Sequence, residues 1–547
     1  FIVNPNGGTF GPEARVDVAG LLASTFRIAE TDFFAGRYRF EQDPTRGLAA
    51  IVNQGEIRVS PSGFVFLVAP AVSNEGLIVA NLGKVVLGSG ESLFVDFMGD
   101  GLIHFDIGGK VLESVTTPDG RRLDAAVSNS GRIQADGGQV VLQAHAGRSI
   151  FSSVVNNGGI IEARSLVNHG GVVRLEGGDP VEGPIRVGAE NNLGRVRNAE
   201  GVVLDTGVID VSAMQADAVR GQVFITGELV GVSGEVRASG GGDVLVSSTA
   251  RTVLTASSRI DVSGGEASDA GHAVVWSDTA TQFFGTIFGK GGDLGGDGGQ
   301  AEVSGHDTLG YSGIVDLSAA KGTAGSLLLD PLTLRIRIGP PANLDIFLPF
   351  VSDVSNTVVG EVSAPAVQAA LANGSVFLGA LERLDAEPGA VITWGANTTL
   401  QMFTTSAVPG GGIDLGGLEL NATGVGQVLI NGNTTLQNFP CDVVTPRITS
   451  AGGLIDARAP TGLLTVQQVI SSSGGPVTLV GSSVRLSQNV TGGSVDVIAL
   501  NPALGTLTID PGVVVRGPLR ITYQAAEMFL AGSTSDSFSA SSRLHSF

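Results

Sequence analysis

The sequence predicts an all-β fold, a right-handed parallel β-helix (β-solenoid), from the spacing of its strands, its glycine content and its shortage of large aromatic residues. Apolar strand positions recur at intervals of 27, 24, 27 and 28 residues, at Ile209, Val236, Ile260, Ile287 and Val315. Glycine supplies 81 of the 547 residues, whereas there are only 2 Trp and 3 Tyr. Many turns and few bulky side chains suit a thin core repeated from coil to coil, because each coil of a solenoid buries its apolar residues by stacking on its neighbours.

Composition and charge exclude several other classes of protein. Hydrophobic residues make up 42% of the chain, which argues against disorder and against collagen. The formal net charge of −20 disfavours nucleic acid and anionic lipid as partners. No apolar run approaches the roughly 20 residues that span a bilayer, so we expect no membrane insertion. The single cysteine, Cys441, cannot form a disulfide within the chain.

The first 40 residues contain the most specific signal in the chain. Asn4, Pro5, Asn6 and Gly7 have turn chemistry, since Pro5 presets φ for the first central position and Gly7 accepts a positive φ. A short strand therefore runs into a tight corner. Polar and apolar residues then alternate over residues 15–18, as expected of a half-buried strand.

This stretch and the segments after it resemble the secretion domain of the filamentous haemagglutinin family, the exoproteins of bacterial two-partner secretion. The resemblance covers residues 1–165 in detail and the later repeats more loosely. The strings that carry it include Asn4-Pro5-Asn6-Gly7, Phe10-Gly11-Pro12, Val16-Asp17-Val18, Leu22-Ala23-Ser24-Thr25, Val52-Asn53-Gln54-Gly55, Val72-Ser73-Asn74-Glu75-Gly76 and Ser153-Val154-Val155-Asn156-Asn157.

The resemblance implies a function. It makes the chain a secreted exoprotein at the cell surface of a Gram-negative-type bacterium, an adhesin or structural matrix fibre exported by an outer-membrane two-partner transporter. It places Asn4, Pro5, Asn6 and Gly7 in the domain that the transporter recognises. The same residues are also compatible with a purely structural role, in which they only close the turn, and the two roles do not exclude each other.

Two departures from the family stand out. Gly8 occupies a position that is usually aliphatic, which loosens the turn. Family members also carry a signal peptide and a cap before this corner, whereas the chain starts at Phe1 within the domain. We therefore expect it to be a fragment or a processed product.

Residues 41–165 begin the repeat with a recurring Asn-x-Gly corner. Each corner precedes a short apolar strand, as a solenoid requires. The corners begin at Asn53, Asn74, Asn129 and Asn156.

Residues 92–107 are different and predict a hairpin with a loop at residues 99–101. In its register Asp96 faces His104, with Asp100 and Asp106 nearby. A carboxylate opposite an imidazole can begin a metal or acid–base site, but an exposed cross-strand charge pair gives the same pattern, and one histidine is weak evidence for a metal.

The repeats of residues 166–337 place Asp210, Asp261 and Asp316 at equivalent positions. Aspartates at equivalent positions suggest a catalytic site, as in pectin-degrading β-helices. However, an Asp that recurs beside a Ser is more typical of a turn. The glycine-rich residues 291–299 suggest a calcium-binding nonapeptide, yet Leu294 replaces a required glycine, so a flexible surface loop is the better interpretation.

Residues 338–375 interrupt the repeats. Ser363, Pro365 and Gly374 bound one short helix near residues 363–373, which we expect to cover an end or side of the solenoid. Residues 376–547 form a second solenoid segment of smaller coils, with apolar triplets starting at residues 477, 495, 507 and 519, and the serine-rich residues 532–547 form a frayed end.

Three hypotheses about function remain open. The first is the exoprotein described above, with no enzyme activity, no catalytic residue, no cofactor and no metal, binding host or neighbouring-cell surface glycans or proteins. The second is a β-helical carbohydrate-active enzyme, which needs converging carboxylates and aromatic platforms. The third is a trimeric tailspike-like binding fibre. Uncovered terminal coils also predict a head-to-tail homo-oligomer if the cap does not lie outside this chain.

Overall fold

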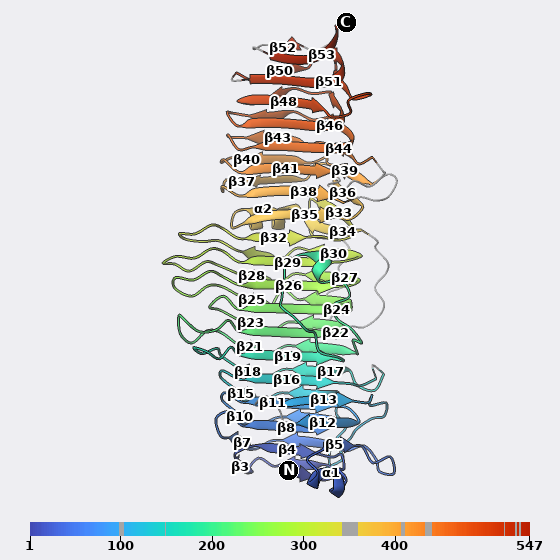
Figure 1. Cartoon of the computed structure of the whole chain (residues 1–547), viewed down its shortest axis with the longest axis vertical. Coiled ribbons are helices and arrows are strands. Elements are labelled where there is room, and N and C mark those ends of the chain that lie inside the picture. Colours follow the sequence, from blue (N-terminus) through green and yellow to red (C-terminus); the bar gives the residue numbers. More distant parts are fainter. Residues whose placement is uncertain are drawn as a thin grey trace.

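The chain winds into one elongated stack of coils, with its two ends at opposite ends of the stack (Figure 1). The structure is a computed structural model, and it describes residues 1–97, 103–147, 149–341, 359–405, 411–432, 440–518, 520–530, 533–534 and 538–546. Strands pair in parallel with strands of the next coil, in sheets of 33, 10 and 7 strands. The predicted parallel β-helix is confirmed.

Each coil contributes strands to three faces. The first face comprises β1 (Ile2–Val3), β4 (Leu21–Ser24), β8 (Phe64–Ala69), β11 (Lys84–Ser89), β16 (Gln139–Ala144), β19 (Val172–Gly177), β22 (Gln222–Val232), β24 (Asp243–Leu254), β26 (His272–Ser277), β29 (Gln300–Gly305), β32 (Ser326–Leu329), β35 (Ser375–Ala380), β38 (Thr399–Thr404), β41 (Gln427–Gly432), β44 (Ile455–Val466), β46 (Pro476–Leu486), β48 (Ser494–Ala499), β51 (Arg520–Leu530) and β53 (Phe538–Ser546).

The second face continues the same 33-stranded sheet around a corner, and β22, β24, β44, β46, β51 and β53 are long enough to contribute to both faces. Its other strands are β2 (Gly8–Phe10), β6 (Ala50–Asn53), β9 (Ala71–Asn74), β14 (Ala125–Asn129), β17 (Ser153–Asn157), β20 (Val202–Asp205), β27 (Ala280–Phe283), β30 (Thr308–Tyr311), β33 (Thr333–Arg337), β34 (Gly360–Ser363), β36 (Arg383–Ala386), β39 (Gly412–Asp414), β42 (Asp442–Val444) and β49 (Thr506–Ile509).

The third face consists of the two smaller parallel sheets. The first sheet holds β3 (Arg15–Val18), β7 (Glu56–Val59), β10 (Leu77–Val79), β15 (Arg132–Gln134), β18 (Ile160–Glu162), β21 (Val208–Asp210), β23 (Glu235–Arg237), β25 (Arg259–Asp261), β28 (Thr286–Phe288) and β31 (Ile314–Asp316). The second holds β37 (Val391–Trp394), β40 (Glu419–Ala422), β43 (Arg447–Ser450), β45 (Ile470–Ser472), β47 (Val490–Thr491), β50 (Val514–Arg516) and β52 (Ser533–Thr534).

Stacked aliphatic columns form the core between the faces. On the third face the register pairs Ile209 with Val236, Val236 with Ile260, Ile260 with Ile287 and Ile287 with Val315, as the sequence spacing predicts. All five side chains are buried. Because the same kind of residue recurs at the same height in each coil, one continuous apolar core runs along the stack.

The predicted spacing of the later coils is wrong in part. Val477, Val495 and Ile521 do stack on one another, on the first face. Leu507 instead pairs with Val484 and Met528 on the second face. The triplets at 495 and 507 therefore lie on two faces of one coil, because short strands on adjacent faces have the same apolar pattern.

A column of glycines marks the corner before the third face. A Cβ built on Gly76, Gly131, Gly159, Gly207 or Gly234 would lie 2.1–2.2 Å from the carbonyl oxygen of the glycine one coil below. Such a distance is far inside van der Waals contact. Only glycine therefore lets successive coils approach closely at this corner.

A ladder of amide side chains lies directly before these glycines. Asn53 donates to Asn74, Asn74 to Asn129, Asn129 to Asn157 and Asn157 to Asp205, each through Nδ2 to Oδ1 at 2.8 Å. All five are buried. The predicted corner that began at Asn156 is thus displaced by one residue, because the neighbouring Asn157 is the one that faces the core.

A small antiparallel sheet covers the outside of the first face near the N-terminus. It comprises β5 (Tyr38–Glu41), β12 (Ser92–Asp96) and β13 (His104–Gly108). The register of β12 and β13 places Asp96 opposite His104, which confirms the predicted pairing. The predicted loop at residues 99–101, with Asp100, lies outside the described residues.

The predicted helix is α2 (Ala364–Leu371), which starts after Ser363 and buries Val367 and Leu371. It contacts β31 and β37 and so fills the third face between the two smaller sheets. It closes a side of the solenoid and not an end. A second short helix, α1 (Glu30–Phe34), and a 3-10 turn, η1 (Ala189–Asn191), were not expected from the sequence.

Strand order is locally reversed around the interruption at residues 338–375. On the second face β34 pairs with β30 on one side and with β33 on the other, and β33 then pairs with β36. β34 therefore lies between β30 and β33 in the sheet, although it follows β33 in the sequence. On the first face β32 pairs directly with β35, so the parallel ladder continues across this segment.

The glycine-rich residues 291–299 are hydrogen-bonded to loops on both sides. Leu294 N–H donates to the Glu266 carbonyl at 2.7 Å, and Gly291 N–H donates to the Ser318 carbonyl at 2.9 Å. This part of the chain is one layer in a stack of loops that project from several coils (Figure 1). The prediction of a surface loop is confirmed, since Leu294 is 63% exposed, and the structure adds that neighbouring loops hold it.

Candidate functional site

The corner at Asn4–Gly7 is a hydrogen-bonded turn at the N-terminal end of the stack. Gly7 N–H donates to the Asn4 carbonyl at 3.0 Å, and φ of Gly7 is +87°. The Asn4 side chain closes the turn twice, since its Oδ1 accepts Asn6 N–H at 3.2 Å and its Nδ2 donates to the Gly7 carbonyl at 2.8 Å. A Cβ on Gly7 would lie 2.8 Å from the Ala50 carbonyl oxygen, so the fold requires glycine here.

The asparagine side chains of this corner are exposed, and the backbone on either side is paired on one edge. Among the described strands β1 pairs only with β4 and β2 only with β6. Asn6 is held by Arg46, whose Nη1 donates to Asn6 Oδ1 at 3.1 Å. The corner thus presents amide groups that hydrogen bonds hold in place.

Aromatic rings gather next to the corner. The Phe1 ring lies 5.6 Å from Phe33, 5.5 Å from Tyr38 and 6.1 Å from Phe97 between ring centroids. Phe1 is 54% exposed and Phe34 of α1 is 83% exposed. These rings form one aromatic cluster beside the corner. Head-to-tail association stays a prediction.

The three aspartates that suggested a catalytic site do not converge on one point. Asp210, Asp261 and Asp316 each accept the backbone N–H of the serine two residues later, at 2.9, 3.1 and 3.1 Å. They stack in one column, but Arg237 and Phe288 stand between them. Their role is to close turns, as the alternative interpretation predicted.

Metal ligands do not gather either in the described part of the chain. No group of three or more His, Cys, Asp and Glu residues within it is placed to hold a metal ion. Asp96 and His104 form a cross-strand pair on the small antiparallel sheet. No helix in the described ranges is long and apolar enough to cross a membrane.

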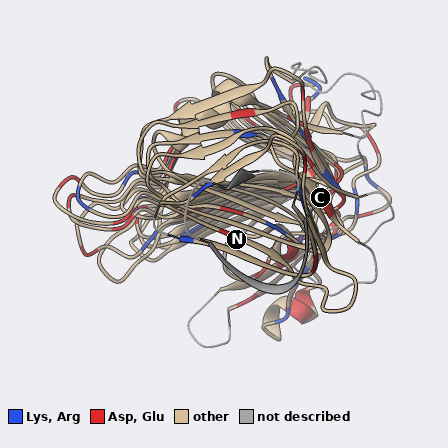
Figure 2. Cartoon of the chain, turned by 90° about the horizontal axis from the view of Figure 1, so that it is seen from above, with Lys and Arg blue, Asp and Glu red and all other residues tan. Residues whose placement is uncertain are grey.

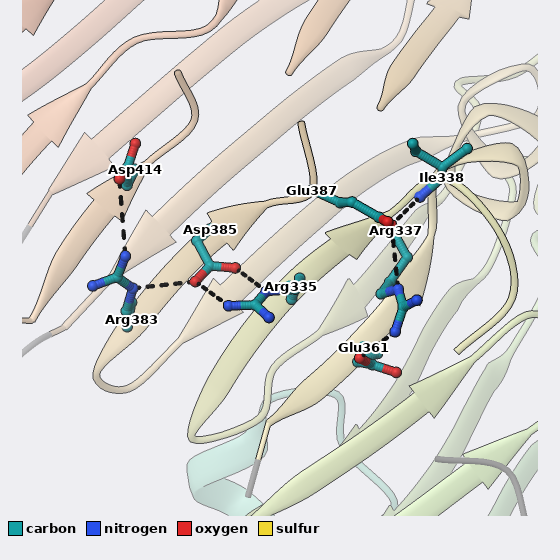
Figure 3. A network of polar contacts seen from close by, with 8 residues as sticks. All are labelled: Arg335, Arg337, Ile338, Glu361, Arg383, Asp385, Glu387 and Asp414. Carbon is teal, nitrogen blue, oxygen red and sulfur yellow. Dashed lines mark hydrogen bonds and ion pairs between the residues drawn. The ribbon is translucent and has the colours of Figure 1, made fainter. Parts of the chain in front are cut away.

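A groove of about 760 Å³ crosses the second face where strand order is reversed. Arg335 donates to both carboxylate oxygens of Asp385, at 2.6 and 3.0 Å, and Arg383 Nε donates to the same carboxylate at 3.2 Å. Arg337 joins Glu361 at 2.7 Å and Glu387 at 3.3 Å (Figure 3).

The acidic and basic side chains of this groove form ion pairs with one another. Burial alone would raise the pKa of Asp385, but hydrogen bonds and charge from Arg335 and Arg383 outweigh it and hold that pKa below its usual value. The network ties β34, β33, β36 and β39 together. Elsewhere acidic and basic residues are interspersed along the coils and loops (Figure 2).

Comparison with known proteins supports the predicted resemblance. Residues 1–193 match the model of the TPS secretion domain. A solved structure, the HMW1 secretion domain from Haemophilus influenzae, is 27% identical, with 60% of this chain and 79% of that chain covered and a TM-score of 0.45. Among curated proteins, none matches the chain.

The N-terminal part of the chain is therefore similar to TPS secretion domains, and the predicted resemblance to filamentous haemagglutinin-type exoproteins of two-partner secretion is confirmed. A domain of this kind makes the chain a secreted protein of Gram-negative bacteria.

Proposed function

We propose that the Asn4–Gly7 corner is recognised by an outer-membrane two-partner transporter, and that the exported solenoid acts at the cell surface as an adhesin or structural matrix fibre. The observation that carries this is the position of the corner. Asn4 and Asn6 are exposed, their side chains are fixed by hydrogen bonds, and they lie within the residues that match the secretion domain.

The division of the chain predicted from the sequence is compatible with this proposal. Residues 1–165 would carry the export signal, while residues 166–337 and 376–547, joined through 338–375, would form the displayed rod. A rod built from ladders and small loops offers a long surface for glycans or proteins on a host or neighbouring cell. An acidic chain also stays soluble while it is extended.

Replacing Asn4 and Asn6 by alanine in the full-length gene product is expected to leave most of the chain in the periplasm. Asn6→Ala alone is the cleaner variant, because it removes one exposed hydrogen bond and is expected to change the free energy of unfolding by no more than about 0.5 kcal/mol. The measurement is the ratio of chain in the medium to chain in the periplasm by immunoblot.

Asn501→Ala is the matched control. Asn501 Oδ1 accepts the N–H groups of Ala503 and Leu504, so it closes a turn of the same kind far from the N-terminal coil. Export of this variant should be normal. If the Asn4 and Asn6 variants are exported as well as the control, transporter recognition at the corner is wrong.

A further inference from the structure

A second cavity, of about 510 Å³, lies along the edge between the first and second faces. Its volume falls within the range of small-molecule sites. Its walls are mainly apolar and aromatic, with a few polar groups. The residues that line it are Gly188, Glu190, Asn191, Leu193, Trp276, His306, Leu328, Asp330, Leu381, Phe403 and Thr405.

The hollow exists because small residues stand between two large ones in one outward-facing column. The register pairs Trp276 with Ser304, and Gly379 with Phe403. Asp330 lies between these pairs, since its N–H donates to Ser304 Oγ at 3.1 Å and its Oδ1 is 2.6 Å from a Cβ built on Gly379. Trp276, which is 1% exposed, forms the closed end, and the half-buried Phe403 forms the other.

A loop far away in the sequence supplies the outer wall. Residues 178–200 fold back over the first face, where Ile185 packs with Trp276. Glu302 holds this loop, because its Oε2 accepts Gly188 N–H at 2.7 Å and Asn192 Nδ2 at 2.9 Å. These contacts hold the loop in place, and the loop forms the outer wall of the cavity.

The cavity is negatively charged without a matching cation. Glu190 and Asp330 line it, and behind its wall the buried Glu302 has a carboxylate oxygen, Oε1, with no hydrogen-bond partner among the described residues. No Lys or Arg is among the described residues that line it. Two more titratable groups interact with Asp330, the buried Glu302 and His306, whose Nδ1 contacts Asp307 Oδ1 at 2.8 Å.

The pKa of Asp330 reflects its buried and negatively charged surroundings. Burial, followed by the charge of Glu190, raises the pKa of Asp330 to about 6. A carboxylate held in apolar surroundings gains most from a cation that brings its own apolar surface, because the charges compensate and the body of the ligand packs on aromatic and leucine side chains.

We propose that this cavity binds an organic ammonium ion with an apolar body. The positive group would lie between Asp330 and Glu190, and the apolar part against Phe403, Leu328 and Leu381. This goes beyond the export function, and it is tested on the purified chain, so failure of one proposal leaves the other intact.

Choline and its uncharged isostere 3,3-dimethylbutan-1-ol are the probes, titrated into the purified chain by calorimetry at pH 7.5. Choline is expected to bind at least about tenfold more tightly, a difference of about 1.4 kcal/mol. Asp330→Asn should remove that preference, whereas Asp414→Asn, in the separate arginine-lined groove, should keep it. Lowering the pH to 5 should weaken choline binding, since Asp330 becomes protonated below about 6.

Thermal unfolding of both variants confirms that the fold is intact. Equal binding of choline and the isostere, unchanged preference in Asp330→Asn, or no binding of choline at millimolar concentration would each overturn the proposal. Vesicles of phosphatidylcholine then separate two sources of the ligand. If the chain co-sediments with the vesicles and free choline prevents this, the ligand is a headgroup displayed on a membrane. If the chain binds choline but does not co-sediment, the ligand is a free small molecule.

Discussion

Gly159→Ala is expected to lower the free energy of unfolding by about 3 kcal/mol, an effect at the upper end of those caused by overpacking. A Cβ at this position would lie 2.1 Å from the Gly131 carbonyl oxygen. That carbonyl cannot move away easily, because it accepts Ile160 N–H at 3.0 Å as part of the ladder between coils. The added methyl must push two coils apart.

Gly158→Ala is the matched control, one residue earlier at the same corner. The nearest atom to a Cβ on Gly158 is Thr206 Oγ1 at 3.5 Å, an ordinary contact with the end of a side chain. Urea or thermal unfolding of the two variants measures the difference. Similar destabilisation of both would show that loss of glycine flexibility, and not contact between coils, is the cause.

Asp205→Asn is expected to stabilise the protein at pH 8 by about 2 kcal/mol and to have little effect at pH 4. Asp205 ends the amide ladder, where Asn157 donates to its Oδ1 at 2.8 Å, while Oδ2 has no hydrogen-bond partner in the described part of the chain. Burial raises the pKa of Asp205 to about 7. A shift of about three units corresponds to about 4 kcal/mol, part of which the unpaired amide of the variant would offset.

The direction of this pH dependence follows from the raised pKa. The unfolded chain loses the Asp205 proton near pH 4 and the folded chain near pH 7, so the native protein loses stability as the pH rises between these values. The variant has no such loss. Melting temperatures at pH 4 and pH 8 test this, with Asp210→Asn, at a half-buried turn, as a control that should show no gain at pH 8. An equal effect of Asp205→Asn at both pH values would contradict the account.

Local periodicity was enough to predict the repeating parts of the fold. The column from Ile209 to Val315 could be aligned because each coil there has nearly the same length, and the Asn4–Gly7 turn because its residue types determine its dihedral angles. The hairpin register could be predicted from alternation alone. These features depend on residues close together in the chain or on a regular period.

Other features depend on contacts that the sequence does not reveal. Asn156 and Asn157 are adjacent and alike, so only the core decides which one joins the ladder. The insertion of β34 between β30 and β33 breaks the order of the coils. The cavity wall rests on Asn192 and Glu302, 110 residues apart, and neither a single loop asparagine nor a single strand glutamate gives a signal of such a partner.

The central claim is that this β-helix is exported by two-partner secretion. The most direct test compares cells with and without the partner outer-membrane transporter, each expressing the full-length gene product, and measures by immunoblot how much of the chain reaches the medium and surface. We expect the chain outside the cell only when the transporter is present, and retained or degraded in the periplasm when it is not. Equal amounts outside both kinds of cell would contradict the claim.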